Sequence, residues 1–210
     1  MPTEITILLS KAHPVKDAVV SLVEGDVRDA AGKAGDYLMR AINVVGTETP
    51  MTDGQKSIWK GCFLADPTRK STLKAFDVIF NTWKGITADH TIKLADSPYV
   101  TKFGEIHLNY NDFVVGNRPI LQARVWRYIH EATHKFAGTR DIGVGIWTML
   151  TDGASEKCYL NAGAALKESK IGYRLPGLGP DDALKNADSY AGFVVLLEQL
   201  RNGLFRPVAS

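Results

Sequence analysis

Apolar positions recur every three to four residues along several stretches of the chain, which is the period of a helix that buries one face. The stretches that show this period are residues 14–44, as two short helices around Gly25 and Gly32, residues 68–84, residues 119–137 and residues 181–201. In the third stretch Pro119 stands near the start and Gly138 directly after the end. Proline is common in the first turn of a helix, and glycine is common directly after its last turn. We therefore expect this helix to run to about Ala137 and to stop at Gly138.

One segment has the period of a strand instead. Residues 103–110 alternate apolar and polar side chains, which predicts a half-buried strand. We expect it to lie in a small antiparallel β region beside the 119–137 helix, with His107 facing solvent. The pattern as a whole predicts an α+β fold that is mostly helical.

Composition and charge limit the classes of protein that need to be considered. With 210 residues, 45% of them hydrophobic, the chain can bury a good core. Glycine and proline in the segment 46–54 predict a boundary between an N-terminal helical segment, 1–50, and a larger domain, 51–210. The apolar runs are too short to span a membrane, and a net charge of +2 without a basic stripe predicts no nucleic-acid partner.

The predicted helix 119–137 contains His130-Glu131-Ala132-Thr133-His134, a match to the H-E-x-x-H zinc motif. Residues four apart share one face of a helix, so both imidazoles can reach one metal while Glu131 lies beside its open position. Zinc lowers the pKa of water at that position, and a neighbouring carboxylate can accept the proton. The motif predicts a Zn2+ cofactor with Glu131 as the catalytic base. The alternative is a solvated helix face with two surface histidines.

A zinc enzyme usually takes three protein ligands, so a third one is needed. Ala137 and Arg140 stand where an extended motif would need glycine and a third histidine, which excludes that class. Asp141 follows Gly138, which lets the chain turn back towards the metal, and Glu156 lies further on. From the residues alone both acids stay open as the third ligand.

Two more motifs follow H-E-x-x-H in order: Gly138-Thr139-x-Asp141 and Asn186-Ala187-Asp188-Ser189-Tyr190. With them the chain resembles the aspzincin metalloendopeptidases, the family of deuterolysin and the peptidyl-Lys metalloendopeptidases. The resemblance implies a zincin-like catalytic domain over residues 51–210 that acts on a protein or peptide substrate. It also implies the roles of four residues, namely zinc ligands at His130, His134 and Asp141 and a general base at Glu131.

The chain departs from the family at two positions. Val144 stands where the family has a tyrosine thought to stabilise the oxyanion, so another donor is needed. The candidates are backbone N–H groups and the phenols of Tyr128, Tyr173 and Tyr190. Asp188 either contacts the substrate's basic side chain or supports the metal site, and Ala191 replaces a second acid, so we do not expect strict lysine specificity.

These features predict a zinc-dependent metalloendopeptidase. The alternatives are a zinc amidase acting on cell-wall peptide and a catalytically inactive zinc-binding interaction protein. The first residues lack an ordinary secretory signal peptide, which fits a mature fragment, a cytoplasmic enzyme or a bacterial effector exported by a specialised apparatus. We favour the effector, which would have an inhibitor or immunity partner. Cys62 and Cys158 fit one disulfide or two buried thiols equally well.

Overall fold

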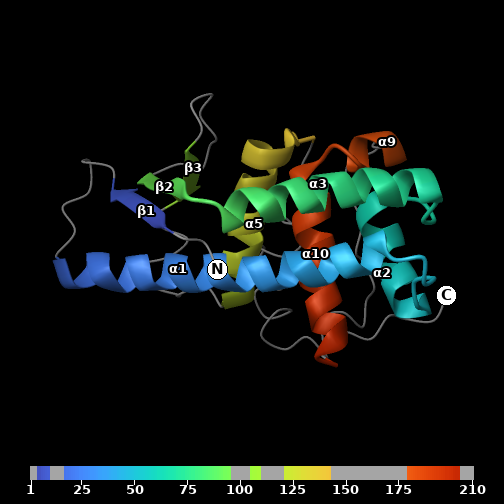
Figure 1. The fold of residues 1–210 in the computed structure, drawn as a ribbon, viewed down its shortest axis with the longest axis horizontal. Coiled ribbons are helices and arrows are strands. Elements are labelled where there is room, and N and C mark those ends of the chain that lie inside the picture. Colours follow the sequence, from blue (N-terminus) through green and yellow to red (C-terminus); the bar gives the residue numbers. More distant parts are fainter. Residues whose placement is uncertain (1–3, 10–16, 96–104, 110–120, 143–178, 204–210) are drawn as a thin grey trace.

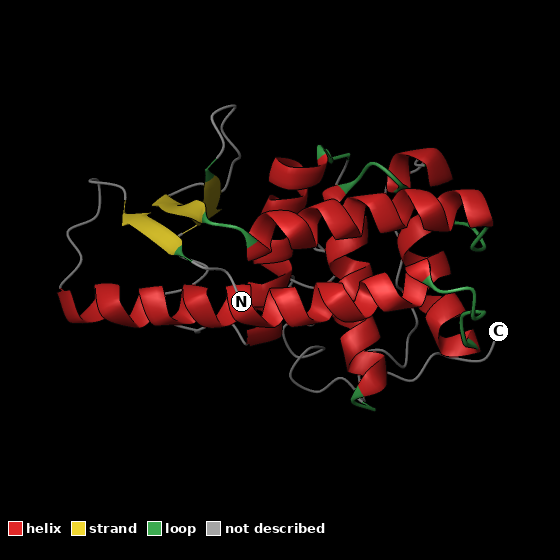
Figure 2. Ribbon diagram, viewed as in Figure 1, coloured by secondary structure: helices red, strands yellow, loops and turns green. Residues whose placement is uncertain are grey.

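The structure of the chain is a computed structural model that describes residues 4–9, 17–95, 105–109, 121–142 and 179–203. Helices form most of it, and a small sheet lies at one end (Figures 1 and 2). The described elements are β1 (Ile5–Leu9), α1 (Asp17–Gly46), α2 (Asp53–Phe63), α3 (Arg69–Thr87), β2 (His90–Ala95), β3 (Ile106–Asn109), α5 (Leu121–Ala137), α9 (Pro180–Ala183) and α10 (Ala187–Arg201). The predicted α+β architecture, mostly helical, is confirmed.

The sheet has the strand order β1-β2-β3, and both of its strand pairs are parallel. The predicted antiparallel arrangement is therefore wrong. Alternation along a strand indicates which side chains share a face, whereas strand direction depends on the connection. Parallel strands need a long crossover, and α1, α2 and α3 supply one between β1 and β2.

The strand β3 lies at the edge of the sheet and contacts α5. Its side chains Ile106, His107 and Leu108 are all buried, and His107 is only 1% exposed. The expectation that His107 faces solvent is wrong, because β3 is covered on both faces. The Nε2 atom of His107 lies 3.2 Å from the Glu105 carboxylate.

The first helix, α1, continues without a break through Gly25 and Gly32, where the sequence predicts two shorter helices. It lies lengthwise beside α3 and also packs on α5 (Figure 1). Small and apolar side chains, among them Ala30, Ala34 and Leu38, are fully buried along it. Tertiary packing of this face outweighs the low helix propensity of the glycines. The boundary near residue 50 is not tested by this packing and stays a prediction.

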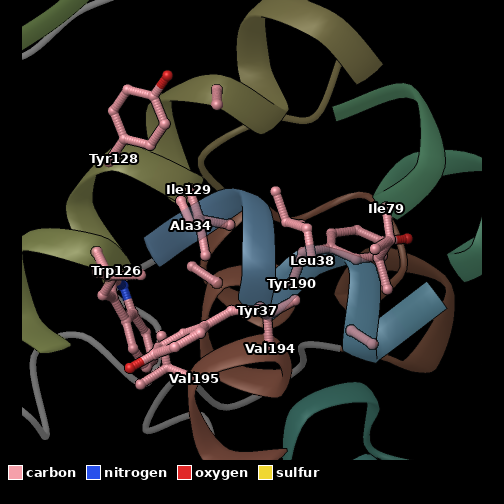
Figure 3. Packing of buried hydrophobic residues seen from close by; sticks show 14 of the residues in the cluster. Ala34, Tyr37, Leu38, Ile79, Trp126, Tyr128, Ile129, Tyr190, Val194 and Val195 are labelled. Atoms are coloured by element: carbon pink, nitrogen blue, oxygen red, sulfur yellow. The ribbon is translucent and has the colours of Figure 1, made fainter. Parts of the chain in front are cut away.

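The last helix, α10, is buried on all sides from Ala187 to Gln199. Figure 3 shows Tyr190, Val194 and Val195 in one cluster with residues of α1, α3 and α5. A single helix from 181 to 201 is wrong, because a turn at Leu184 and Lys185 separates α9 from α10 and Asn186 adopts an extended backbone where it pairs with Arg140. The start of α10 thereby meets the segment that follows α5.

None of the described helices is both long and apolar enough to cross a lipid bilayer.

Candidate metal centre

The site helix α5 is fixed to the body of the protein by its inner face. Val125, Trp126 and Ile129 are fully buried, and Arg124 forms an ion pair of 2.6 Å with Asp26 of α1. The helix ends at Ala137, as predicted, and Gly138 adopts a positive φ of 66°. This left-handed conformation favours glycine, and it turns the chain back along the last turn of the helix.

The turn brings three donor atoms together. The Nε2 atoms of His130 and His134 lie 3.1 Å apart. The Asp141 Oδ1 atom lies 3.1 Å from the first and 3.2 Å from the second. The structure therefore places the three predicted ligands around one point, and they form a candidate metal site.

The outer nitrogens of the two rings determine which atoms face this point. The Nδ1 atom of His134 lies 2.9 Å from the Thr139 carbonyl, which can only accept a hydrogen bond. The Nδ1 atom of His130 lies 2.7 Å from the Asp188 carboxylate. Each Nδ1 therefore carries a proton and donates it. In the neutral rings both Nε2 atoms then present lone pairs towards the Asp141 oxygen.

Three electron-pair donors in contact repel one another unless a cation lies between them. Tetrahedral zinc has bonds of about 2.0–2.2 Å to nitrogen and oxygen, which places its ligand atoms roughly 3.3–3.6 Å apart. The observed separations of 3.1 to 3.2 Å are close to this range. Two imidazoles with one carboxylate also suit zinc better than magnesium or calcium, which prefer oxygen ligands. The residues present fit the metal that the sequence predicts.

The protonation of the metal-free site agrees with this geometry. Burial lowers the pKa of His130, but hydrogen bonds to Asp141 and Asp188 outweigh it and raise that pKa to about 10. The hydrogen bonds from His130 and His134 hold the pKa of Asp141 well below its usual range. In the metal-free protein a proton thus supplies the positive charge that the donors require.

Glu131 lies next to this cluster. Its Oε1 atom is 3.9 Å from His130 Nε2, and the residue is only 4% exposed. Among the residues that the structure describes, its Oε2 atom has no hydrogen-bond partner. Burial raises the pKa of the Glu131 carboxyl above its ordinary value, which suits a group that must accept and release a proton.

The segment that leads into α10 supports the cluster from behind. Asp188 holds the His130 ring from the edge opposite Nε2, and the Asn186 Oδ1 atom accepts a hydrogen bond of 3.0 Å from the Ile142 N–H. This contact favours a supporting role for Asp188 over contact with substrate. Sequence reasoning missed the contribution of Asn186, although its place in the Asn-Ala-Asp segment marks it.

Two threonines of the motifs also support the site, and sequence reasoning missed both. The Oγ1 atoms of Thr133 and Thr139 lie 2.8 Å apart, and the Thr139 carbonyl orients His134. Thr133 additionally donates to the His130 carbonyl at 2.8 Å. The sequence indicated this role only through Thr133, whose hydroxyl stands at one of the two variable positions of the H-E-x-x-H motif.

Two of the three tyrosines considered as oxyanion donors, Tyr128 and Tyr190, are described, and both lie away from the metal cluster. Tyr190 is fully buried and its hydroxyl donates to the Leu184 carbonyl at 2.8 Å. The Tyr128 hydroxyl lies 2.6 Å from His90 Nε2. Neither phenol belongs to the metal cluster. Four other residues considered from the sequence lie outside the described residues, namely Val144, Glu156, Cys158 and Tyr173.

Comparisons with known proteins bear on the fold. No known family profile matches the chain, and no curated protein matches its sequence. Among solved structures, the chain is similar to a zinc peptidase from Grifola frondosa, with a TM-score of 0.52 over 86% of this chain and 96% of that one. The two are 16% identical, so the likeness shows the fold alone. The fold is the predicted zincin-like α+β fold, and it carries a candidate metal site of two histidines and an aspartate.

Proposed function

We propose that the chain is a zinc-dependent metalloendopeptidase in which His130, His134 and Asp141 hold the metal. One observation carries the proposal: the three donor atoms converge to within 3.2 Å of one another. Glu131 lies beside them and is buried, and its Oε2 atom has no hydrogen-bond partner among the described residues. A structural zinc site would usually be closed by four protein ligands, often cysteines, whereas the cluster has three ligands and no cysteine among the residues that the structure describes.

Each residue has a distinct task in the proposed reaction. When bound, zinc supplies a Lewis acid that activates water and polarises the peptide carbonyl. Glu131 accepts the proton of the attacking water at its free oxygen and returns it to the leaving nitrogen. Asp188 and the Thr139 carbonyl keep the two rings turned so that their Nε2 atoms face the metal.

The likeness in fold to a zinc peptidase supports this choice of chemistry, and a protein or peptide substrate is part of the proposal. Nothing in the described residues bears on export or on an inhibitor or immunity partner, so both stay predictions.

The test is hydrolysis of a peptide library by the zinc-loaded protein, with products identified by mass spectrometry. Glu131→Gln should retain zinc, as measured by elemental analysis, but lose about 10²- to 10⁴-fold in turnover. Glu48→Gln, at an exposed glutamate, is the matched control and should cleave like the wild type. Near wild-type hydrolysis by Glu131→Gln would contradict the assignment. Stoichiometric zinc without cleavage of any peptide would refute the endopeptidase, and assays on purified cell-wall sacculi would then test the amidase.

A further inference from the structure

Asn186 occupies the N-cap of α10 without capping it. An asparagine at this position ordinarily accepts a hydrogen bond from an N–H in the first turn of its own helix. Here the side chain makes no such bond. Its Oδ1 atom accepts instead from the Ile142 N–H, 44 positions away along the chain, at 3.0 Å. The residue is fully buried, so this hydrogen bond lies in the interior of the protein and not at its surface.

The reason lies in the short parallel bridge between Arg140 and Asn186. The Arg140 N–H donates to the Lys185 carbonyl at 2.8 Å, and the Ala187 N–H donates to the Arg140 carbonyl at 3.0 Å. In a parallel pair the next bond would run from the Ile142 N–H to the Ala187 carbonyl. Ala187 is the first residue of α10, however, and its carbonyl accepts within the helix. The Asn186 side chain supplies the acceptor that the backbone no longer offers.

Asp141 lies between the two residues that are held in this way. Two of the three metal donors belong to the rigid helix α5, whereas Asp141 belongs to the segment after it and its side chain is 69% exposed. Within the described part of the chain, its side chain forms ion pairs with the two histidines alone. Its backbone is fixed instead, on one side by the Arg140 bridge and on the other by the bond from Ile142 to Asn186.

We propose that Asn186 is a positioning residue for Asp141: it gives up capping its own helix in order to hold the third metal ligand in place. The inference rests on the proposed function in so far as the metal is zinc. Because Asp188 holds His130, the N-cap and the first turn of α10 then orient two of the three donors.

Two substitutions at this position separate positioning from stability. Serine is a good N-cap but is too short to reach Ile142, so Asn186→Ser should keep the start of α10 while removing the acceptor of the Ile142 N–H. Its zinc dissociation constant, measured by competition with a chromogenic chelator, should rise about 10- to 100-fold. Asn186→Asp keeps an acceptor oxygen at the same reach, so its zinc affinity should stay within about threefold of the wild type. Asn202→Ser, at the other end of α10, is the matched control and should bind zinc normally.

A double-mutant cycle tests whether Asn186 acts through Asp141. In an Asp141→Ala background the ligand is already missing, so adding Asn186→Ser should cause no further loss of zinc affinity. A further loss as large as in the wild-type background would overturn the inference, because Asn186 would then act on the site by another route.

Two other results would also overturn it. One is wild-type zinc affinity in Asn186→Ser. The other is a loss of zinc affinity in Asn186→Asp as large as the loss expected for Asn186→Ser. The aspartate variant alone decides this point if the serine variant does not fold. Failure of the proposed function can be distinguished from failure of the inference about Asn186. If the wild type binds zinc but cleaves no peptide, the endopeptidase proposal fails while the affinity measurements still decide the role of Asn186.

Discussion

Zinc binding to this site should compete with a proton on His130, and the competition should extend to unusually high pH. A histidine with its ordinary pKa of about 6.5 is neutral above pH 7.5 and no longer affects metal affinity there. In the metal-free protein the carboxylates of Asp141 and Asp188 raise the pKa of His130 to about 10 against the effect of burial. Zinc must therefore displace this proton throughout the physiological range.

The size of the effect follows from that pKa. Each unit of pH below about 10 should weaken apparent zinc affinity about tenfold, so affinity should rise about 1,000-fold from pH 6 to pH 9. The same raised pKa has a consequence for folding. Its stabilisation is fully present below about pH 6.5 and is lost as the pH rises through about 10. The metal-free protein should thus lose up to about 5 kcal/mol of stability over this interval.

Isothermal titration calorimetry in two buffers of different ionisation enthalpy measures the protons released per zinc bound. We expect one proton from His130 at both pH 7 and pH 8.5. Asp188→Asn keeps an oxygen that can accept a hydrogen bond from the His130 ring but removes the negative charge of the carboxylate. The pKa of His130 should therefore fall, and fewer protons should be released per zinc bound at pH 8.5. An affinity that is flat from pH 7 to pH 9, with no proton released, would refute this reasoning.

Three predictions concern the helices that hold the site. Gly85→Ala should destabilise the protein by about 1–3 kcal/mol in urea denaturation, because its Cβ atom would clash with the Phe136 ring. Gly25→Ala, in the open middle of α1, should instead stabilise it by about 0.5–1 kcal/mol, and a loss there would contradict the helical assignment. Asp26→Ala should cost about 3–5 kcal/mol in the same assay, because it leaves Arg124 buried without its ion-pair partner; a loss below 1 kcal/mol would show that the pair is dispensable.

Local patterns in the sequence predicted the parts of the structure that depend on local chemistry. The period of apolar residues located α5, and Gly138 marked its end because few other residues adopt a positive φ without strain. The spacing of His130 and His134 placed both rings on one face. The resemblance to a family selected Asp141, and the structure brings that residue to the two rings.

The remaining features depend on contacts between distant segments. Alternation in 103–110 indicated a strand but could not reveal its parallel pairing with β2. The continuity of α1 through its glycines comes from packing on α3 and α5, which no local propensity contains. The roles of Asn186 and Asp188 depend on α10 meeting the segment after α5, and the break before α10 exists because of the same contact.

We propose that one zinc ion held by His130, His134 and Asp141 makes the chain a peptidase. It is tested most directly by adding zinc in steps to metal-free protein while cleavage of a peptide found in the library is followed. We expect no cleavage without metal, a linear rise in rate as zinc is added, and a plateau at one zinc per chain. Cleavage by the metal-free protein, or none at one equivalent of bound zinc, would contradict it.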